Sequence, residues 1–110
     1  MYKRQVEKGE TLYEVALKYK GHNHDVTLKQ DGTVVSVEKE ITARDLPRAV
    51  SEALAAKYPR ATFKKVEEIR EGKKLTYEVL LVTANKKTIE VVLDPSGKVA
   101  KEESKNKKED

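Results

Sequence analysis

Apolar and polar residues alternate along much of this chain, which is the pattern of β-strands that bury one face. Between residues 13 and 19, the apolar face comprises Tyr13, Val15, Leu17 and Tyr19, and the opposite face Glu14, Ala16 and Lys18. Val26 and Leu28 continue the pattern, and Asp31-Gly32 after them is a strong hairpin signal. The next stretch, 34–39, predicts a strand of ambiguous register because Val34 and Val35 are adjacent.

The same alternation returns in the second half of the chain. A strand is predicted over 63–69, then a turn at Glu71-Gly72 and a strand whose apolar face comprises Leu75, Tyr77, Val79 and Leu81. A polar loop over 84–87 precedes another alternating segment with Ile89, Val91 and Leu93. Asp94-Pro95-Ser96-Gly97 is typical of a type I turn, and it predicts a last strand over about 98–102.

One segment follows a helical period instead. Leu46, Val50, Leu54 and Tyr58 recur at intervals of four, which predicts a helix over about residues 46–58. Thr42 or Asp45 can cap its start, Pro47 suits its first turn, and Tyr58-Pro59 ends it. The predicted fold class is therefore α+β. We expect an antiparallel sheet of about seven to eight strands, in two repeated hairpin sets, with the α-helix packed on one face.

Two stretches of the chain resemble each other in order and spacing. Residues 12–17 line up with 76–81, and Gly9 ahead of the first stretch corresponds to Gly72 ahead of the second. The matching positions further along are Leu28, Gly32 and Val34 against Leu93, Gly97 and Val99. We predict an internal duplication in which the second copy is preceded by a helix and a strand, whereas the first copy has almost nothing there.

Short motifs in the second copy follow a recognisable order. They are Leu46-Pro47-Arg48-Ala49-Val50, Lys57-Tyr58-Pro59-Arg60-Ala61, Tyr77-Glu78-Val79 and Leu93-Asp94-Pro95-Ser96-Gly97-Lys98-Val99. Together they resemble the PepSY-like, beta-lactamase-inhibitor-like domain. The resemblance implies one complete module over 41–103 and the C-terminal half of a preceding module over 6–40. It also implies a continuous antiparallel sheet, location in the bacterial periplasm or outside the cell, and no catalytic residues.

The chain departs from this family at its ends. Residues 1–5 match nothing in the family, and we interpret them as a possible non-native leader of a truncated gene product. The N-terminus also carries no signal-peptide segment. Residues 104–110 are charged and predict a disordered tail. The first module lacks its helix, so we expect its bare apolar face to self-associate or to be covered by bending of the sheet. The residues of that face are Tyr13, Val15, Leu17, Val26 and Leu28.

Composition narrows the functional classes. The 110 residues include no Cys and no Trp, and 38% are charged, which fits one small domain and excludes disulfides, zinc-thiolate sites and cysteine nucleophiles. No apolar run approaches the roughly 18 residues of a membrane span. The net charge of +4 is scattered, because lysines such as Lys64 and Lys65 are followed by Glu67 and Glu68. We therefore predict a solvated strand surface and no nucleic-acid partner.

His22-Asn23-His24-Asp25 is the one concentration of possible metal ligands in the sequence. Two imidazoles two residues apart can lie on one side of an extended strand, and Asp25 can orient one of them or add an oxygen ligand. Because the sequence shows no third ligand, we interpret the segment as a polar hairpin loop. We predict no cofactor and no metal, with His22 and His24 as weak candidates for metal binding.

The sequence lacks the usual catalytic constellations. The carboxylates of Glu67-Glu68, like those of Glu102-Glu103, are adjacent and would point to opposite faces of a strand, so they cannot share a proton. No serine lies in a nucleophile-elbow motif, and no glycine-rich phosphate loop is present. The tyrosines are interpreted as core or core-edge residues with their hydroxyls at the rim. The predicted core and interaction residues are Tyr13, Val15, Leu17, Leu46, Val50, Leu54, Tyr58, Tyr77, Val79 and Leu81.

These observations, with the resemblance, predict a non-catalytic exported binding module that contacts or inhibits a protein such as a peptidase or other hydrolase. The alternative is an accessory or structural domain of the envelope that binds a small ligand or metal, for which His22 and His24 would be the distinguishing feature. A passive stability module without a partner of its own is a third interpretation.

Overall fold

The computed structural model describes residues 10–105 and, by their backbone, residues 2–7. In this part of the chain, eight strands and one α-helix form the predicted α+β fold. The strands are β1 (Tyr2–Glu7), β2 (Glu10–Tyr19), β3 (His22–Lys29), β4 (Val34–Ile41), β5 (Thr62–Glu71), β6 (Lys74–Val82), β7 (Thr88–Leu93) and β8 (Val99–Ser104). Between β4 and β5 lie a short 3-10 helix, Ala43–Asp45, and the helix α1, Arg48–Lys57.

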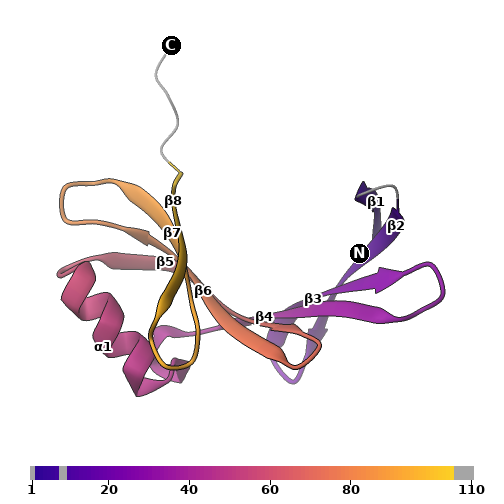
Figure 1. Cartoon of the computed structure of the whole chain (residues 1–110), viewed down its shortest axis with the longest axis horizontal. Helices are drawn as coiled ribbons and strands as arrows, with labels where there is room; N and C mark the ends of the chain where they lie inside the picture. Colours follow the sequence, from indigo (N-terminus) through magenta and orange to yellow (C-terminus); the bar gives the residue numbers. More distant parts are fainter. Residues whose placement is uncertain (1, 8–9, 106–110) are drawn as a thin grey trace, which may run out of the picture.

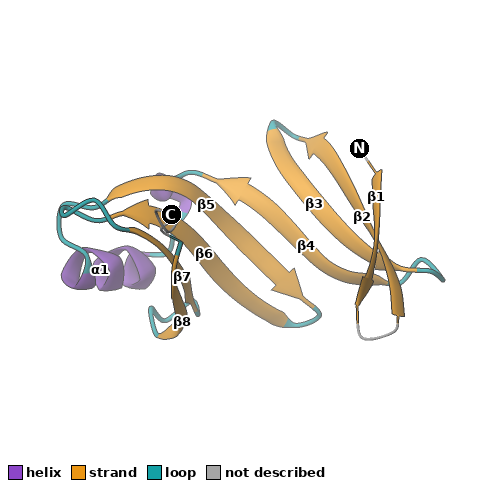
Figure 2. Cartoon of the chain, turned by 90° about the horizontal axis from the view of Figure 1, so that it is seen from above, coloured by secondary structure: helices purple, strands orange, loops and turns teal. Residues whose placement is uncertain are grey.

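The sheet is a single antiparallel meander. Every strand pairs with the next one along the chain, so the order in space is β1 to β8. Figure 1 shows α1 at one end of the molecule, beside β5, β7 and β8, and the hairpins of β1 to β4 at the other end. The sheet twists strongly between the two ends, as the view from above shows (Figure 2). None of the described helices is long and apolar enough to cross a membrane.

Prolines flank helix α1 and determine where it begins and ends. The carbonyl oxygen of Pro47 accepts hydrogen bonds from the N–H groups of Val50 and Ser51, each at 3.0 Å, and so starts the helix. The helix ends at Tyr58, which precedes proline and whose N–H donates to the Leu54 carbonyl at 2.8 Å. Leu46 thus lies before α1 and Tyr58 at its C-terminal cap, although the sequence predicts both inside it. Both side chains are nevertheless buried.

The core lies between α1 and the C-terminal half of the sheet. Val50 and Leu54 of the helix are at most 1% exposed. The fully buried strand residues beneath them are Val79, Leu81, Val91 and Leu93. The same cluster includes Ile41, Leu46, Tyr58, Val66 and Tyr77. Full burial of one such side chain stabilises a fold by about 1.5–3 kcal/mol, so this cluster supplies most of the apolar stabilisation. We call the side of the sheet that α1 packs on the helix face.

Two glycine turns close the hairpins β3–β4 and β7–β8. Gly32 has a φ of 90° and Gly97 a φ of 92°, which glycine adopts without steric cost. The second turn lies against α1, because a Cβ built on Gly97 would be 2.5 Å from the carbonyl oxygen of Ala49. A Cβ built on Gly32 would meet nothing within 4 Å. Only the second turn is therefore enclosed by a helix.

The sheet differs from the sequence-based expectation in several places. Residues 2–5, interpreted as a possible leader, lie within β1 and pair with β2. At the other end, β8 continues to Ser104, which pairs with Ile89, so the described chain is still in the sheet where a tail was predicted. Residues 106–110 of that predicted tail lie outside the described residues. The leader and the module boundaries stay predictions.

The ambiguous register of β4 is explained by a β-bulge. Val34 lies opposite Leu28 and Ser36 opposite Thr27, which leaves Val35 as the extra residue between the two pairs. An equivalent shift occurs between β7 and β8, next to Leu93. Val34 and Val35 can therefore be adjacent within a single strand, because the bulge lets the apolar residues on both sides of it, Val34 and Val37, face the same side.

The helix face of β2–β4 repeats the pairing found beneath α1, but no described helix lies over it. The equivalent pairs are Tyr13–Leu28 and Val15–Val26 on one side, and Tyr77–Leu93 and Val79–Val91 on the other. Leu17 is 43% exposed, whereas Leu81 at the corresponding position is 0% exposed. The described strands therefore leave this face partly open. Whether a duplication produced the equivalence stays a prediction.

Candidate functional site

The side of the sheet opposite the helix face carries a row of carboxylates from six neighbouring strands. Strand register places like charges directly opposite each other in the pairs Asp25–Glu38, Glu40–Glu67 and Glu67–Glu78. We call this surface the acidic face, and its carboxylate residues on β2 to β7 are Glu14, Asp25, Glu38, Glu40, Glu67, Glu78 and Glu90; Glu103 of β8 lies opposite Glu90. Opposed like charges destabilise a sheet, so stability alone does not account for this row. The acidic face is therefore the candidate site.

Lys65 is the cation at the centre of the acidic face. Its Nζ lies 3.6 Å from Oε2 of Glu67, whose side chain is only 8% exposed. A bulge in β5 places the lysine there, because Phe63 pairs with Leu81 while Lys65 already pairs with Leu80. The charge of Glu67 raises the pKa of Lys65, which keeps the ammonium group protonated. This ion pair offsets part of the cost of burying Glu67.

Two carboxyl groups of the acidic face have raised pKa values. Burial is the main cause for Glu38, and the charges of Glu67 and Asp25 raise its pKa further. Burial, followed by the charge of Glu90 and then that of Glu67, raises the pKa of Glu78 to about 7. Glu78 therefore changes its charge near neutral pH, and the acidic face becomes more negative as the pH rises through this range.

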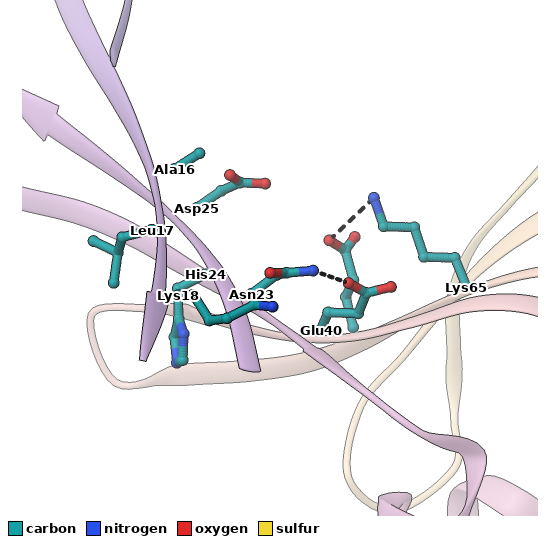
Figure 3. Close-up of a pocket in the computed structure, with 9 residues that line it drawn as sticks. Ala16, Leu17, Lys18, Asn23, His24, Asp25, Glu40 and Lys65 are labelled. Atoms are coloured by element: carbon teal, nitrogen blue, oxygen red, sulfur yellow. Dashed lines mark hydrogen bonds and ion pairs between the residues drawn. The ribbon is translucent and has the colours of Figure 1, made fainter. Parts of the chain in front are cut away.

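The acidic face is hollowed over β2 to β5. A cavity of about 440 Å³, the central hollow, is lined by Ala16, Leu17, Lys18, Asn23, His24, Asp25, Glu40, Lys65 and Glu67. In Figure 3, Asp25 and Lys65 extend toward this space, while Leu17 and His24 point to the other side of the sheet. Nδ2 of Asn23 donates a hydrogen bond to Oε1 of Glu40 at 2.9 Å across the hollow. A second hollow of about 180 Å³ continues past Lys65 to Glu78 and Glu90.

The acidic face also contains a group of side chains with metal-ligand chemistry. Carboxylate oxygens of Asp25, Glu38 and Glu67 lie within 4.8 Å of one another. Three carboxylates are ligands that Ca²⁺ or Mg²⁺ accepts. Here, however, the ammonium group of Lys65 already neutralises Glu67 at 3.6 Å, so the charge that would attract a cation is reduced. The arrangement is that of a polar surface with its own counterion.

The two histidines lie outside the carboxylate group, although His24 lines the central hollow, and the sequence-based interpretation of their segment as a hairpin loop is wrong. They belong to β3, because the turn before it is made by Lys20 and Gly21. Nδ1 of His22 lies 3.1 Å from the carbonyl oxygen of Glu40, and Nδ1 of His24 lies 3.0 Å from that of His22. Because a carbonyl oxygen can only accept, each Nδ1–H donates a hydrogen bond to its carbonyl. Asp25 points to the opposite face of β3, so it does not orient the His24 imidazole.

The predicted core and interaction residues fall into two groups. Those of the buried core are Leu46, Val50, Leu54, Tyr58, Tyr77, Val79 and Leu81. Tyr13, Val15 and Leu17 lie on the open part of the helix face. The prediction that the tyrosine hydroxyls lie at the rim is wrong for Tyr58. Its hydroxyl is buried and has no hydrogen-bond partner among the described residues, and Tyr58 belongs to the core cluster.

The acidic face itself was not predicted from the sequence. The expectation that Glu67 and Glu68 point to opposite faces is confirmed, because Glu67 lies opposite Glu78 and Glu68 opposite Tyr77. The carboxylates that do come together are far apart in sequence, from residue 14 to residue 90. One signal was present: each of the six strands has a Glu or Asp among its outward positions. Combining that pattern with the hairpin turns would have indicated the row.

No protein-family model matches the chain, and no curated protein matches it in sequence. Solved structures with the same fold do exist. A DUF2874 family protein from Bacteroides uniformis superposes with a TM-score of 0.81 at 18% identity, over 94% of this chain and 76% of its own. A BLIP-like protein from Bacteroides fragilis has a TM-score of 0.78 at 16% identity, over 99% and 77% of the two chains.

A third similar structure comes from Bacteroides eggerthii, and its description assigns it provisionally to the periplasm. It has a TM-score of 0.77 at 16% identity and covers 94% of this chain and 76% of its own. At these identities the likeness shows the fold, which is that of a BLIP-like protein. None of these three descriptions names an enzyme.

Proposed function

We propose that this protein is a non-catalytic binding module of the bacterial periplasm or exterior whose acidic face contacts a basic surface of another protein. The observation that carries the proposal is the row of carboxylates opposed across β3 to β6 around the central hollow. A partner that supplied Lys or Arg side chains to this row would relieve repulsion that the free protein must tolerate. The fold of a BLIP-like protein supports a role in protein binding.

The motifs in the sequence allow the type of binding module to be proposed more narrowly. The Leu46-Pro47 and Asp94-Pro95-Ser96-Gly97 motifs start α1 and close the β7–β8 hairpin, which are the roles that a PepSY-like module would require. We extend the proposal to a module of this type that restrains a peptidase or other hydrolase. Location in the periplasm agrees with the description of the Bacteroides eggerthii structure.

The lining of the central hollow favours a protein partner over a small ligand. Small-molecule sites are enclosed and mostly apolar, with a few polar groups that fix orientation. The central hollow is instead an open depression in which Lys18, Asp25 and Glu40 present charges to solvent. An extended charged surface of this kind suits the polar rim and electrostatic steering of a protein interface.

The positions of the histidines support a non-catalytic role. Proton transfer needs an imidazole within hydrogen-bond reach of a nucleophile or a substrate proton. The Nδ1 atoms of His22 and His24 both face backbone carbonyl oxygens. The hydrogen-bond partners of both Nδ1 atoms are thus backbone groups of β3 and β4, and the carboxyl groups with raised pKa values, Glu38 and Glu78, lie on the acidic face.

The test begins with capture of partners from a periplasmic extract of a Bacteroides species on the immobilised chain. Each captured protein is then purified and its affinity measured directly by biolayer interferometry at several salt concentrations. We expect an identified basic partner whose affinity falls as salt screens the acidic face. If the partner is a hydrolase, its activity should fall when the complex forms.

Two double variants localise the contact. Asp25→Asn with Glu40→Gln removes two charges from the acidic face and preserves shape, so it should weaken binding by about tenfold or more. Glu52→Gln with Glu102→Gln removes the same charge from exposed positions outside that face and should leave binding unchanged. Equal affinities of both variants for the partner would contradict the proposal. A metal or small molecule that binds the central hollow without any protein partner would favour the accessory-domain alternative.

A further inference from the structure

The exposed apolar side chains of this protein gather on one part of one face. Among the described residues, the large hydrophobic side chains that remain exposed are Leu17, Tyr19 and Val34, at 43%, 57% and 53%. All belong to β2 and β4, and none to the helix or to β5–β8. Half-buried apolar residues of the same face extend the group. We call this surface the open apolar face, and it comprises Tyr13, Val15, Leu17, Tyr19, Val26, Leu28, Val34 and Val37.

The same sheet shows how such residues behave when they are covered. Val79 and Val91 pair beneath α1 and are 0% exposed, whereas the equivalent pair Val15 and Val26 is only half-buried. The residue types and the strand pairing are the same, so the difference is the cover that α1 provides at one end only (Figure 1). The open apolar face therefore retains apolar area that a second layer would remove from water.

We propose that the occupant of the open apolar face is a second copy of this chain, related by a two-fold axis, so that two sheets pack face to face as a symmetric dimer. Sheets in such sandwiches lie about 10 Å apart with their strands within roughly 30° of each other. In such a two-fold contact, the apolar row of one copy packs against the same row of the other copy. The contact uses the face of both copies, so assembly stops at two chains. The proposal is independent of the acidic face and of its partner.

The area of the open apolar face is sufficient for a small dimer interface. Three strands of about eight residues span about 14 Å by 26 Å, from the strand spacing of about 4.8 Å and the rise of about 3.3 Å per residue. Because side chains protrude from the flat sheet, the accessible surface is larger than this rectangle. Each copy would bury about 500–600 Å² of accessible surface, or about 1,000–1,200 Å² for the two copies together. This value lies at the lower end for specific interfaces, so association in the micromolar range is expected.

Three other surfaces of the described chain disfavour self-association. Two acidic faces would oppose their carboxylates, which repel. At one of the two free edges of the sheet, β8 carries Lys101 and Glu103, and Lys105 follows them. Charged edge strands of this kind resist pairing with a second sheet. The exposed side of α1 carries the Arg48–Glu52 ion pair. The open apolar face is thus the surface that offers a second copy the most exposed apolar area, and His22, His24 and Lys39 lie on the same side of β3 and β4 beside it.

The test measures mass against concentration by sedimentation equilibrium, from about 1 µM to about 300 µM, which brackets the affinity expected for this area. The wild-type chain should change from monomer to dimer and not exceed two chains. Leu17→Glu should weaken association at least about tenfold, because each copy would place a charged carboxylate where the apolar side chain is buried by the interface. Lys18→Glu, on the neighbouring residue that faces the other side of β2, should dimerise like the wild type although it changes the charge more.

Tyr19→Lys provides a second variant at a more exposed position, in case Leu17→Glu perturbs the fold as judged by far-ultraviolet circular dichroism. It should also be monomeric. Three results would overturn the proposal: a wild type that stays monomeric throughout the range, a folded Leu17→Glu or Tyr19→Lys variant that associates like the wild type, or mass that grows beyond two chains. A monomeric wild type that binds a hydrophobic dye would assign the face to a different occupant.

Discussion

Replacing Gly97 by Ala should destabilise this protein more than replacing Gly32 by Ala, although both glycines occupy equivalent turns with nearly equal φ values. The left-handed conformation costs alanine about 1–2 kcal/mol, and both variants bear this cost. At Gly97 the added Cβ would also lie 2.5 Å from the Ala49 carbonyl oxygen and 3.3 Å from the Ala53 Cβ. Forcing an extra atom into a packed site typically lowers the free energy of unfolding by about a further 1–3 kcal/mol. We therefore expect a loss of about 2–5 kcal/mol for Gly97→Ala and about 1–2 kcal/mol for Gly32→Ala.

The measurement is equilibrium unfolding in urea, followed by circular dichroism because the chain has no Trp. The difference between the two variants isolates the contact with α1, since the backbone strain is common to both. Equal losses, within about 0.5 kcal/mol, would refute the reasoning and would mean that α1 does not confine the β7–β8 turn.

Two further substitutions test buried polar groups. Tyr58→Phe removes a buried hydroxyl that has no partner among the described residues, so it should raise the free energy of unfolding by about 1 kcal/mol; a loss in urea unfolding would show that the hydroxyl is satisfied. Glu78 has its pKa raised to about 7, so the native state binds more protons than the unfolded state between about pH 4.5 and 7, and stability is lost as pH rises through 7. Glu78→Gln should therefore match the wild type near pH 4 and exceed it by about 1–2 kcal/mol at pH 8, allowing for solvent screening. The exposed control Glu71→Gln should follow the wild-type pH profile, and parallel profiles for all three proteins would contradict the assignment.

Local patterns predicted the elements well because local physics determines them. Alternation over 13–19 identifies a half-buried strand, since successive side chains of a strand must point to opposite faces. The Asp31-Gly32 and Asp94-Pro95-Ser96-Gly97 turns need only the residues that form them, and both hairpins are present. The helix was placed to within two residues, because the four-residue spacing and the proline after Tyr58 both act over short distances.

Contacts between distant segments were not predicted. The bulge at Val35 depends on how β3 and β4 pair, so alternation alone left the register open. The burial of the Tyr58 hydroxyl depends on how the end of α1 packs on the sheet. The acidic face needs the registers of six strands at once, and a shift of one residue in any of them would move its carboxylate to the other face.

By itself, the sequence determined where strands, turns and the helix lie, and which residues of each strand share a face. Only the tertiary structure decided what those faces meet. Leu17 and Leu81 look alike in sequence, yet one is 43% exposed and the other 0% because α1 covers only one end of the sheet. The carboxylates of Asp25, Glu38 and Glu67 likewise form a cluster only through strand pairing. Burial and charge clustering are properties of neighbours in space, and these neighbours are set by the register and by the position of the helix.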